Sequence, residues 1–130
     1  MEIKDKQGIT LAIIIKAKNI NYRKNFLTKN DDEFQVASFG LRSGEKIERH
    51  YHPKQSRTVS KTSEVLVIIE GILTAKIFDE ELIFMSSHVL EQGDTIALIR
   101  GGHELEVNED CKFIEVKQGP YDEKTDKVRF

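Results

Sequence analysis

The chain has 130 residues, 38% of them hydrophobic and 32% charged, which is the size and composition of one globular domain with a single core. Its formal net charge of −2 excludes a broad electrostatic attraction to nucleic acid or to an anionic membrane surface. The single cysteine, Cys111, cannot form an internal disulfide, which is typical of a reducing compartment. We therefore expect a cytoplasmic protein without nucleic-acid or membrane partners.

The first apolar run is "ITLAIII", residues 9–15, which is too short to span a bilayer. Its flank "MEIKDKQG" mixes acids with lysines, unlike a secretory signal. From this run onward, period-two alternation and β-branched residues recur, whereas no stretch has a clear helical period. The predicted strands are Thr10–Lys18, Phe34–Leu41, Glu45–His52, Glu64–Glu70, Ile72–Phe78, Leu82–Leu90, Thr95–Ile99, His103–Val107 and Cys111–Lys117.

Short strands with polar turns between them predict an all-β fold, an antiparallel sandwich or barrel. We interpret residues 1–130 as one domain: an N-terminal strand region over 1–33, a core over about 34–117 and a C-terminal strap over 118–130. A short helix within residues 21–33 remains an alternative for that segment. Tyr121 and Phe130 are the expected anchors of the strap.

Two of the four histidines, His50 and His52, stand one residue apart. On a strand, residues two apart project to the same face, so the two imidazoles would point together into a metal site or a polar pocket. Glu64 opens the next apolar strand, and His103 follows the turn "LIRGG". His88 has no such neighbours and is interpreted as a packing or surface residue.

The order of these residues resembles the two motifs of the cupin superfamily. The first motif is matched by Gly44, His50, His52, Glu64 and Gly71, and the second by Gly93, Asp94, Gly101 and His103. The stretches "TSEVLVIIEG", "LEQGDTIALIRGGHELEV" and "FIEVKQGPYDEKTDKVRF" resemble a group of small single-domain bacterial cupins associated with sugar-nucleotide and surface-glycan pathways. The resemblance implies a double-stranded β-helix, the cupin jelly-roll barrel.

The resemblance also implies that His50, His52, Glu64 and His103 hold a divalent transition metal: Mn, Fe, Ni, Co or Zn. The eleven residues between His52 and Glu64, "PKQSRTVSKTS", are expected to bulge out as a lid. A barrel that holds water or substrate without a metal remains the alternative.

Four further residues are candidates for the site. Glu104 is a candidate base, provided that a bulge turns it inward; otherwise Glu104 and Glu106 face solvent. Arg57, Lys61 and Arg100 are candidates for binding a phosphate or carboxylate of the substrate. Gly101 and Gly102 are expected to serve a turn that needs positive φ.

The function these patterns favour is a metal-binding cupin that acts on a small polar substrate, such as a sugar or sugar-nucleotide derivative, by proton transfer of the isomerase or epimerase type. Two alternatives stay open. One is a metal-free epimerase or ketoisomerase that uses a histidine as base, and the other is a non-catalytic sugar-binding or sensor protein. We also expect a homodimer, because cupins of this size pair and because "ITLAIII" needs a hydrophobic cover.

Overall fold

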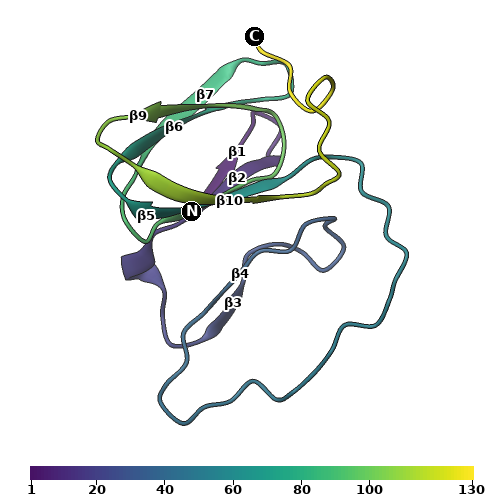
Figure 1. Cartoon of the computed structure of the whole chain (residues 1–130), viewed down its shortest axis with the longest axis vertical. Coiled ribbons are helices and arrows are strands. Elements are labelled where there is room, and N and C mark those ends of the chain that lie inside the picture. The colour runs from purple at the N-terminus through teal and green to yellow at the C-terminus, as the bar shows by residue number, and fades with distance from the viewer.

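The computed structural model describes all residues, 1–130, and consists of ten β-strands and one short 3₁₀ helix (Figure 1). Two antiparallel sheets make up the body of the molecule. The first has the order β1-β2-β8-β5-β10, with strands β1 (Glu2–Lys4), β2 (Thr10–Ile15), β8 (Thr95–Leu98), β5 (Glu64–Glu70) and β10 (Lys112–Lys117). The second has the order β7-β6-β9, with strands β7 (Phe84–Leu90), β6 (Leu73–Phe78) and β9 (Gly102–Val107).

A separate hairpin pairs β3 (Lys24–Phe26) with β4 (Ala37–Phe39), and the 3₁₀ helix η1 (Ala17–Asn19) connects β2 to it. The expected helix within residues 21–33 does not form, since β3 occupies part of that segment. No helix in the structure is long and apolar enough to cross a lipid bilayer.

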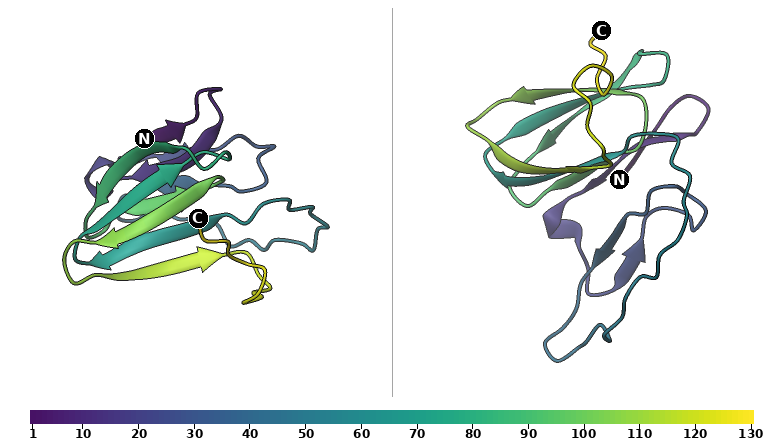
Figure 2. Two further views of the ribbon diagram at one scale, coloured as in Figure 1. Left: turned by 90° about the horizontal axis from the view of Figure 1, so that it is seen from above. Right: turned by 45° about the vertical axis from the view of Figure 1, so that its right-hand side comes forward.

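The two sheets face each other across one hydrophobic core, as the layers in Figure 2 show. β6 illustrates why this sequence forms a strand at that place: Leu73, Ala75 and Ile77 are buried, while Thr74 and Lys76 point outward. The predicted alternation in "ILTAKIF" is therefore confirmed. Other core residues are Leu66 and Ile68 of β5, Leu90 of β7, and Ile96 and Leu98 of β8.

The N-terminal strand β2 is covered on both faces within one chain. Ile14 belongs to the core between the sheets, whereas Ile13 packs with Ala97 and Val36 on the outer face of the first sheet. Leu27 and Phe34, from the segment around the β3–β4 hairpin, pack against this second cluster. The expectation that "ITLAIII" needs a partner subunit as cover is therefore wrong, because the chain buries this run itself.

The all-β prediction is confirmed, and the bounds of β5 are those predicted. β1 and β3 were not predicted, because three residues are too few to show a period. The two sheets also stay open: β1 and β10 are edges of the first, and β7 and β9 are edges of the second. The strands thus form an open sandwich and not a closed barrel.

The predicted strand Glu45–His52 is wrong. Residues 40–63 contain no strand and form a long loop that runs out from the sheets beside the β3–β4 hairpin (Figure 1). The physical reason is that neither face of this segment is apolar. One face would carry Lys46, Glu48 and the two histidines, and the other would offer only Ile47 and Tyr51 for burial.

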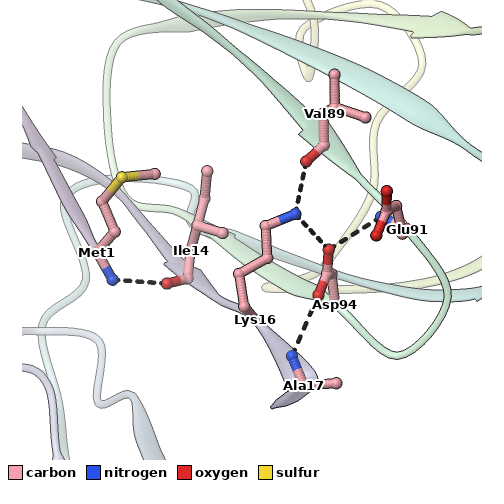
Figure 3. Close-up of polar contacts among 7 residues, drawn as sticks. All are labelled: Met1, Ile14, Lys16, Ala17, Val89, Glu91 and Asp94. Atoms are coloured by element: carbon pink, nitrogen blue, oxygen red, sulfur yellow. Dashed lines mark hydrogen bonds and ion pairs between the residues drawn. The ribbon is translucent and has the colours of Figure 1, made fainter. Parts of the chain in front are cut away.

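An ion pair between the partly exposed Lys16 and the buried Asp94 ties the end of β2 to the second sheet (Figure 3). Lys16 Nζ lies 2.6 Å from Asp94 Oδ2 and donates a second hydrogen bond to the carbonyl oxygen of Val89 in β7 at 2.7 Å. Asp94 also accepts hydrogen bonds from the backbone N–H groups of Ala17 and Glu91. Asp94 is only 5% exposed, so this network satisfies a buried carboxylate and joins both layers.

Candidate functional site

Glu64 and His103 meet between the sheets at one end of the sandwich. Glu64 is the first residue of β5 and lies opposite Leu98, two positions before the core residue Leu66. His103 lies in β9 opposite the buried Ile77. Because residues two apart share a face, both side chains point inward. His103 Nε2 lies 3.4 Å from Glu64 Oε2, so the structure brings together two of the four predicted ligands.

These two residues line a cavity of about 870 Å³. Its apolar wall includes Phe78, Leu98 and Leu105 from the two sheets. Residues 126–130 of the C-terminal strap close one side, and Figure 1 shows the yellow C-terminal segment running from β10 across the gap toward β7. This volume is in the range of a site for a small organic molecule.

Burial shapes the electrostatics of the pair. Burial lowers the pKa of His103, the nearby carboxylate of Glu64 opposes that change, and the ammonium of Lys127 adds to it. The imidazole is therefore neutral at pH 7 and carries a free lone pair. A neutral imidazole beside a carboxylate is an arrangement that can accept a proton from a bound molecule and stabilise the resulting cation.

His50 and His52 do not join this pair. Both are exposed in the loop of residues 40–63, where their rings contact each other edge to face with centroids 5.3 Å apart. His50 Nδ1 forms a hydrogen bond with the carbonyl oxygen of Glu48 at 2.8 Å. No three His, Cys, Asp or Glu side chains converge closely enough to hold a metal ion. The four predicted ligands thus lie in two separate pairs.

The three predicted substrate-binding cations have different surroundings. Arg57 is exposed in the loop and bonds to the amide oxygen of Gln55, and Lys61 pairs with Glu80 at 3.0 Å. Arg100 lines the cavity beside His103, and its Nε atom is buried without a hydrogen-bond partner. Arg100 is therefore the predicted cation that reaches the site.

Glu104 lies on the outer face of β9. Its carboxylate is 2.8 Å from Lys76 Nζ, and that of Glu106 is 3.2 Å from the same atom. The register between β6 and β9 is continuous from Gly102 to Val107, so no bulge turns Glu104 inward. The expected outward phasing of both glutamates is confirmed, and the carboxylate of Glu104 faces away from His103.

The glycines before His103 shape the cavity wall. Gly101 has φ +76°, and a Cβ atom there would lie 2.3 Å from the carbonyl oxygen of Phe78. At Gly102, a Cβ atom would lie 2.7 Å from the ring of Phe130. That ring also packs edge to face on Phe78, with centroids 5.2 Å apart, which places the end of the strap against β6.

Lys127 and Arg129 of the strap also line the cavity and were not predicted as site residues. Their signal in the sequence was indirect: the segment expected to cross the end of the barrel carries them on either side of Val128. Comparisons of the chain with family models, with curated proteins and with solved structures give no match. Function is therefore inferred from the residues of the site.

Proposed function

We propose that the protein binds a small polar molecule between its two sheets and transfers a proton on it, with His103 as the base. The observation that carries this proposal is the contact of His103 with Glu64 in the wall of a cavity of about 870 Å³. A base must reach its substrate and be unprotonated, and the partial burial of His103 provides both conditions.

The orientation of the ring defines the roles. His103 Nε2 lies 3.4 Å from Glu64 Oε2, so in the tautomer with the proton on Nε2 this N–H faces the carboxylate and the lone pair is on Nδ1. In the proposed step, Nδ1 takes the proton from a carbon next to a carbonyl group, and the electron pair of the broken C–H bond moves toward the carbonyl oxygen. Glu64 stabilises the imidazolium. The imidazolium returns the proton either to the opposite face of the same carbon, once the enolate has turned over in the site, or to the former carbonyl carbon, in which case the hydroxyl proton on the first carbon moves to the carbonyl oxygen. The outcome is epimerisation or isomerisation.

Fold and motif order support the class of substrate. An all-β antiparallel sandwich agrees with the strand content of a cupin jelly roll, and Glu64 and His103 follow the order of the two cupin motifs, with a longer segment before Glu64 and with His103 one residue early. We propose on this resemblance that the chain is a cupin and that its substrate is a sugar or sugar-nucleotide derivative.

Deuterium incorporation from D₂O tests the proposal without requiring net conversion. Purified protein is incubated with a panel of keto sugars and sugar nucleotides, and ¹H NMR reports loss of the C–H signal next to the carbonyl. We expect exchange with wild-type protein, a loss of at least about 100-fold with His103→Gln, and no change with His88→Gln. Ligand binding without any exchange would instead support the non-catalytic alternative.

A metal centre is the second candidate function. It is favoured by the finding that both halves of the ligand set already exist as pairs, His50 with His52 and Glu64 with His103. The eleven residues between His52 and Glu64 span up to about 40 Å when extended, so chain length does not prevent the two pairs from meeting. In the present structure the two pairs lie apart, so each pair supplies only two of the four proposed ligands.

Elemental analysis of protein purified without chelators tests this candidate. Four-ligand binding predicts about one metal per chain in wild-type protein. It also predicts loss of the metal in both His50→Ala and His103→Ala, and falling occupancy as pH drops below about 6.5. If His50→Ala keeps the metal, the ion does not use the His50–His52 pair.

A further inference from the structure

Arg100 contains the one buried side-chain nitrogen or oxygen atom in the molecule that lacks a hydrogen-bond partner, its Nε. Leaving a donor of a charged group unsatisfied in a protein interior is costly, and buried polar atoms nearly always find a partner. Arg100 lines a cavity and keeps one buried N–H unsatisfied, so its guanidinium is suited to an acceptor that arrives with a ligand.

The cavity around Arg100 has an excess of unpaired positive charge. Two of its three carboxylates have cationic partners: Asp126 is paired with Lys117, and Glu104 with Lys76. Glu64 faces the neutral His103 and is the one carboxylate whose charge is not balanced in this cavity. Its other cations, Arg100, Lys127 and Arg129, make no ion pair or side-chain hydrogen bond with the protein.

Exposed lysines and arginines are usually just solvated, and Lys127 and Arg129 alone would carry no inference. Their position beside the cavity is what makes them relevant to ligand binding. Both lie on the strap that closes the cavity, and the charge of Lys127 is close enough to lower the pKa of His103. The guanidinium of Arg100 reaches the same cavity from the end of the first sheet, only three residues before His103.

Arg100 also borders a second cavity, of about 850 Å³, on the outer side of the first sheet. That cavity is lined by four acidic and four basic residues: Glu2, Asp31, Asp32, Glu33, Lys4, Lys29, Lys61 and Arg100. Lys4 is paired with Glu2 and Lys61 with Glu80, so two of these cations already have a carboxylate partner. In the cavity that contains His103, Arg100, Lys127 and Arg129 are all without such a partner, so an anionic group is favoured there.

We propose that Arg100, Lys127 and Arg129 form a phosphate-binding subsite, so that the ligand of this cavity is a phosphorylated small molecule. Planar guanidinium groups bind phosphate oxygens in bidentate fashion, which makes arginine suited to this role. The inference rests on the proposed function for the statement that this ligand is the substrate, whereas the anion site itself is tested separately.

Isothermal titration calorimetry with inorganic pyrophosphate, at an ionic strength matched with NaCl, tests the subsite. We expect pyrophosphate to bind wild-type protein at least about tenfold more tightly than succinate. Arg100→Gln and Arg129→Gln should each weaken binding about tenfold or more. Lys112→Gln, which removes a cation paired with Glu70 outside the cavity lining, should leave it unchanged.

An NMR measurement on wild-type protein keeps the test valid if Arg100→Gln fails to fold. The Nε–H resonance of Arg100 should shift on addition of pyrophosphate, and an unmoved resonance would overturn the assignment. His103→Gln separates the two proposals. If it keeps pyrophosphate binding but loses deuterium exchange, both stand. If Arg100→Gln binds pyrophosphate like wild type, the subsite is wrong whatever the exchange data show.

Discussion

Partial burial of His103 makes the folded protein sensitive to acid. Its pKa is lowered by burial, and the pKa of His88 is lowered by burial and by the charge of Lys16. The unfolded chain, with histidine pKa values near 6.5, therefore binds more protons than the folded chain below that pH. The free energy of unfolding therefore has its full value above about pH 6.5. It decreases as the pH falls from there toward the lowered pKa values that the two histidines have in the folded protein.

Thermal unfolding between about pH 8 and pH 5 measures this effect. We expect the melting temperature of wild-type protein to fall below about pH 6.5, and we expect His103→Gln to show a smaller fall than wild type. His88→Gln should likewise reduce the fall of the melting temperature with pH, independently of His103→Gln. A melting temperature that does not change between pH 8 and pH 5 would contradict the burial of both rings.

The candidate site was only partly predictable at the residue scale. Glu64 was noted because it begins an apolar strand and His103 because it follows the turn "LIRGG", and the cupin resemblance placed both in one ligand set. His50 and His52 were expected on a strand because they are two apart, but the residues around them give no apolar face to bury. The unsatisfied Nε of Arg100 has no sequence signal, since it depends on what three-dimensional packing leaves unpaired.

The ion pair between Lys16 and Asp94 should dominate the attachment of β2 to the second sheet. Burial alone would raise the pKa of Asp94, but the Lys16 ammonium and two backbone N–H donors outweigh it and lower the pKa. Asp94→Asn leaves the ammonium without its counter-charge, and we expect a loss of roughly 2–4 kcal/mol in the free energy of unfolding. Urea denaturation measures it.

A Lys16→Met, Asp94→Asn double mutant provides the control, because it removes both charges together. We expect it to be more stable than Asp94→Asn alone. In wild-type protein the contribution of the ion pair should also be lost as pH falls through the lowered pKa of Asp94. Equal stability of Asp94→Asn and wild-type protein would show that the pair contributes nothing.

The turn between β8 and β9 offers a matched pair of substitutions. Gly101→Ala forces a Cβ atom against the backbone of β6 at positive φ, and we expect a loss of roughly 2–4 kcal/mol. Gly102→Ala meets only the end of the Phe130 ring, which can move aside, so we expect a loss of about 1 kcal/mol or less. Chemical denaturation compares the two, and a larger loss for Gly102→Ala would contradict this account of the turn.

Whole strands were predicted where sequence and burial agree. β5 and β6 lie within one residue of their predicted bounds, because alternate residues along each strand are buried. β10 also lies within one residue of its predicted bounds, although its apolar residues are exposed. Sheet order was not predictable, since β5 pairs with β8 and β10 through contacts far apart in the sequence. The open edges of both sheets are likewise a property of long-range pairing.

At the scale of the whole molecule, a homodimer remains a prediction, now with a different reason. The N-terminal strand is buried within the chain, but the outer face of β5 and β10 exposes Ile69, Ile114 and Val116. These residues are 45%, 53% and 57% exposed and lie beside the unpaired edge of β10. A second copy of the chain packed on this face would bury these three apolar side chains.

Sedimentation equilibrium measures the mass in solution. We expect twice the 15.0 kDa of one chain for wild-type protein. Val116→Glu should shift the equilibrium toward monomer, whereas Val89→Glu, which changes an exposed valine of β7, should not. A wild-type mass of one chain would contradict the dimer.

The central claim is that Glu64 and His103 contact each other in the wall of the cavity between the two sheets, and NMR titration of the His103 ring tests it most directly. The account predicts an apparent pKa below 6.5 in wild-type protein. It also predicts a still lower pKa in Glu64→Gln, because the glutamate charge is the largest influence that opposes burial. A His103 pKa near 6.5 that Glu64→Gln leaves unchanged would contradict the account.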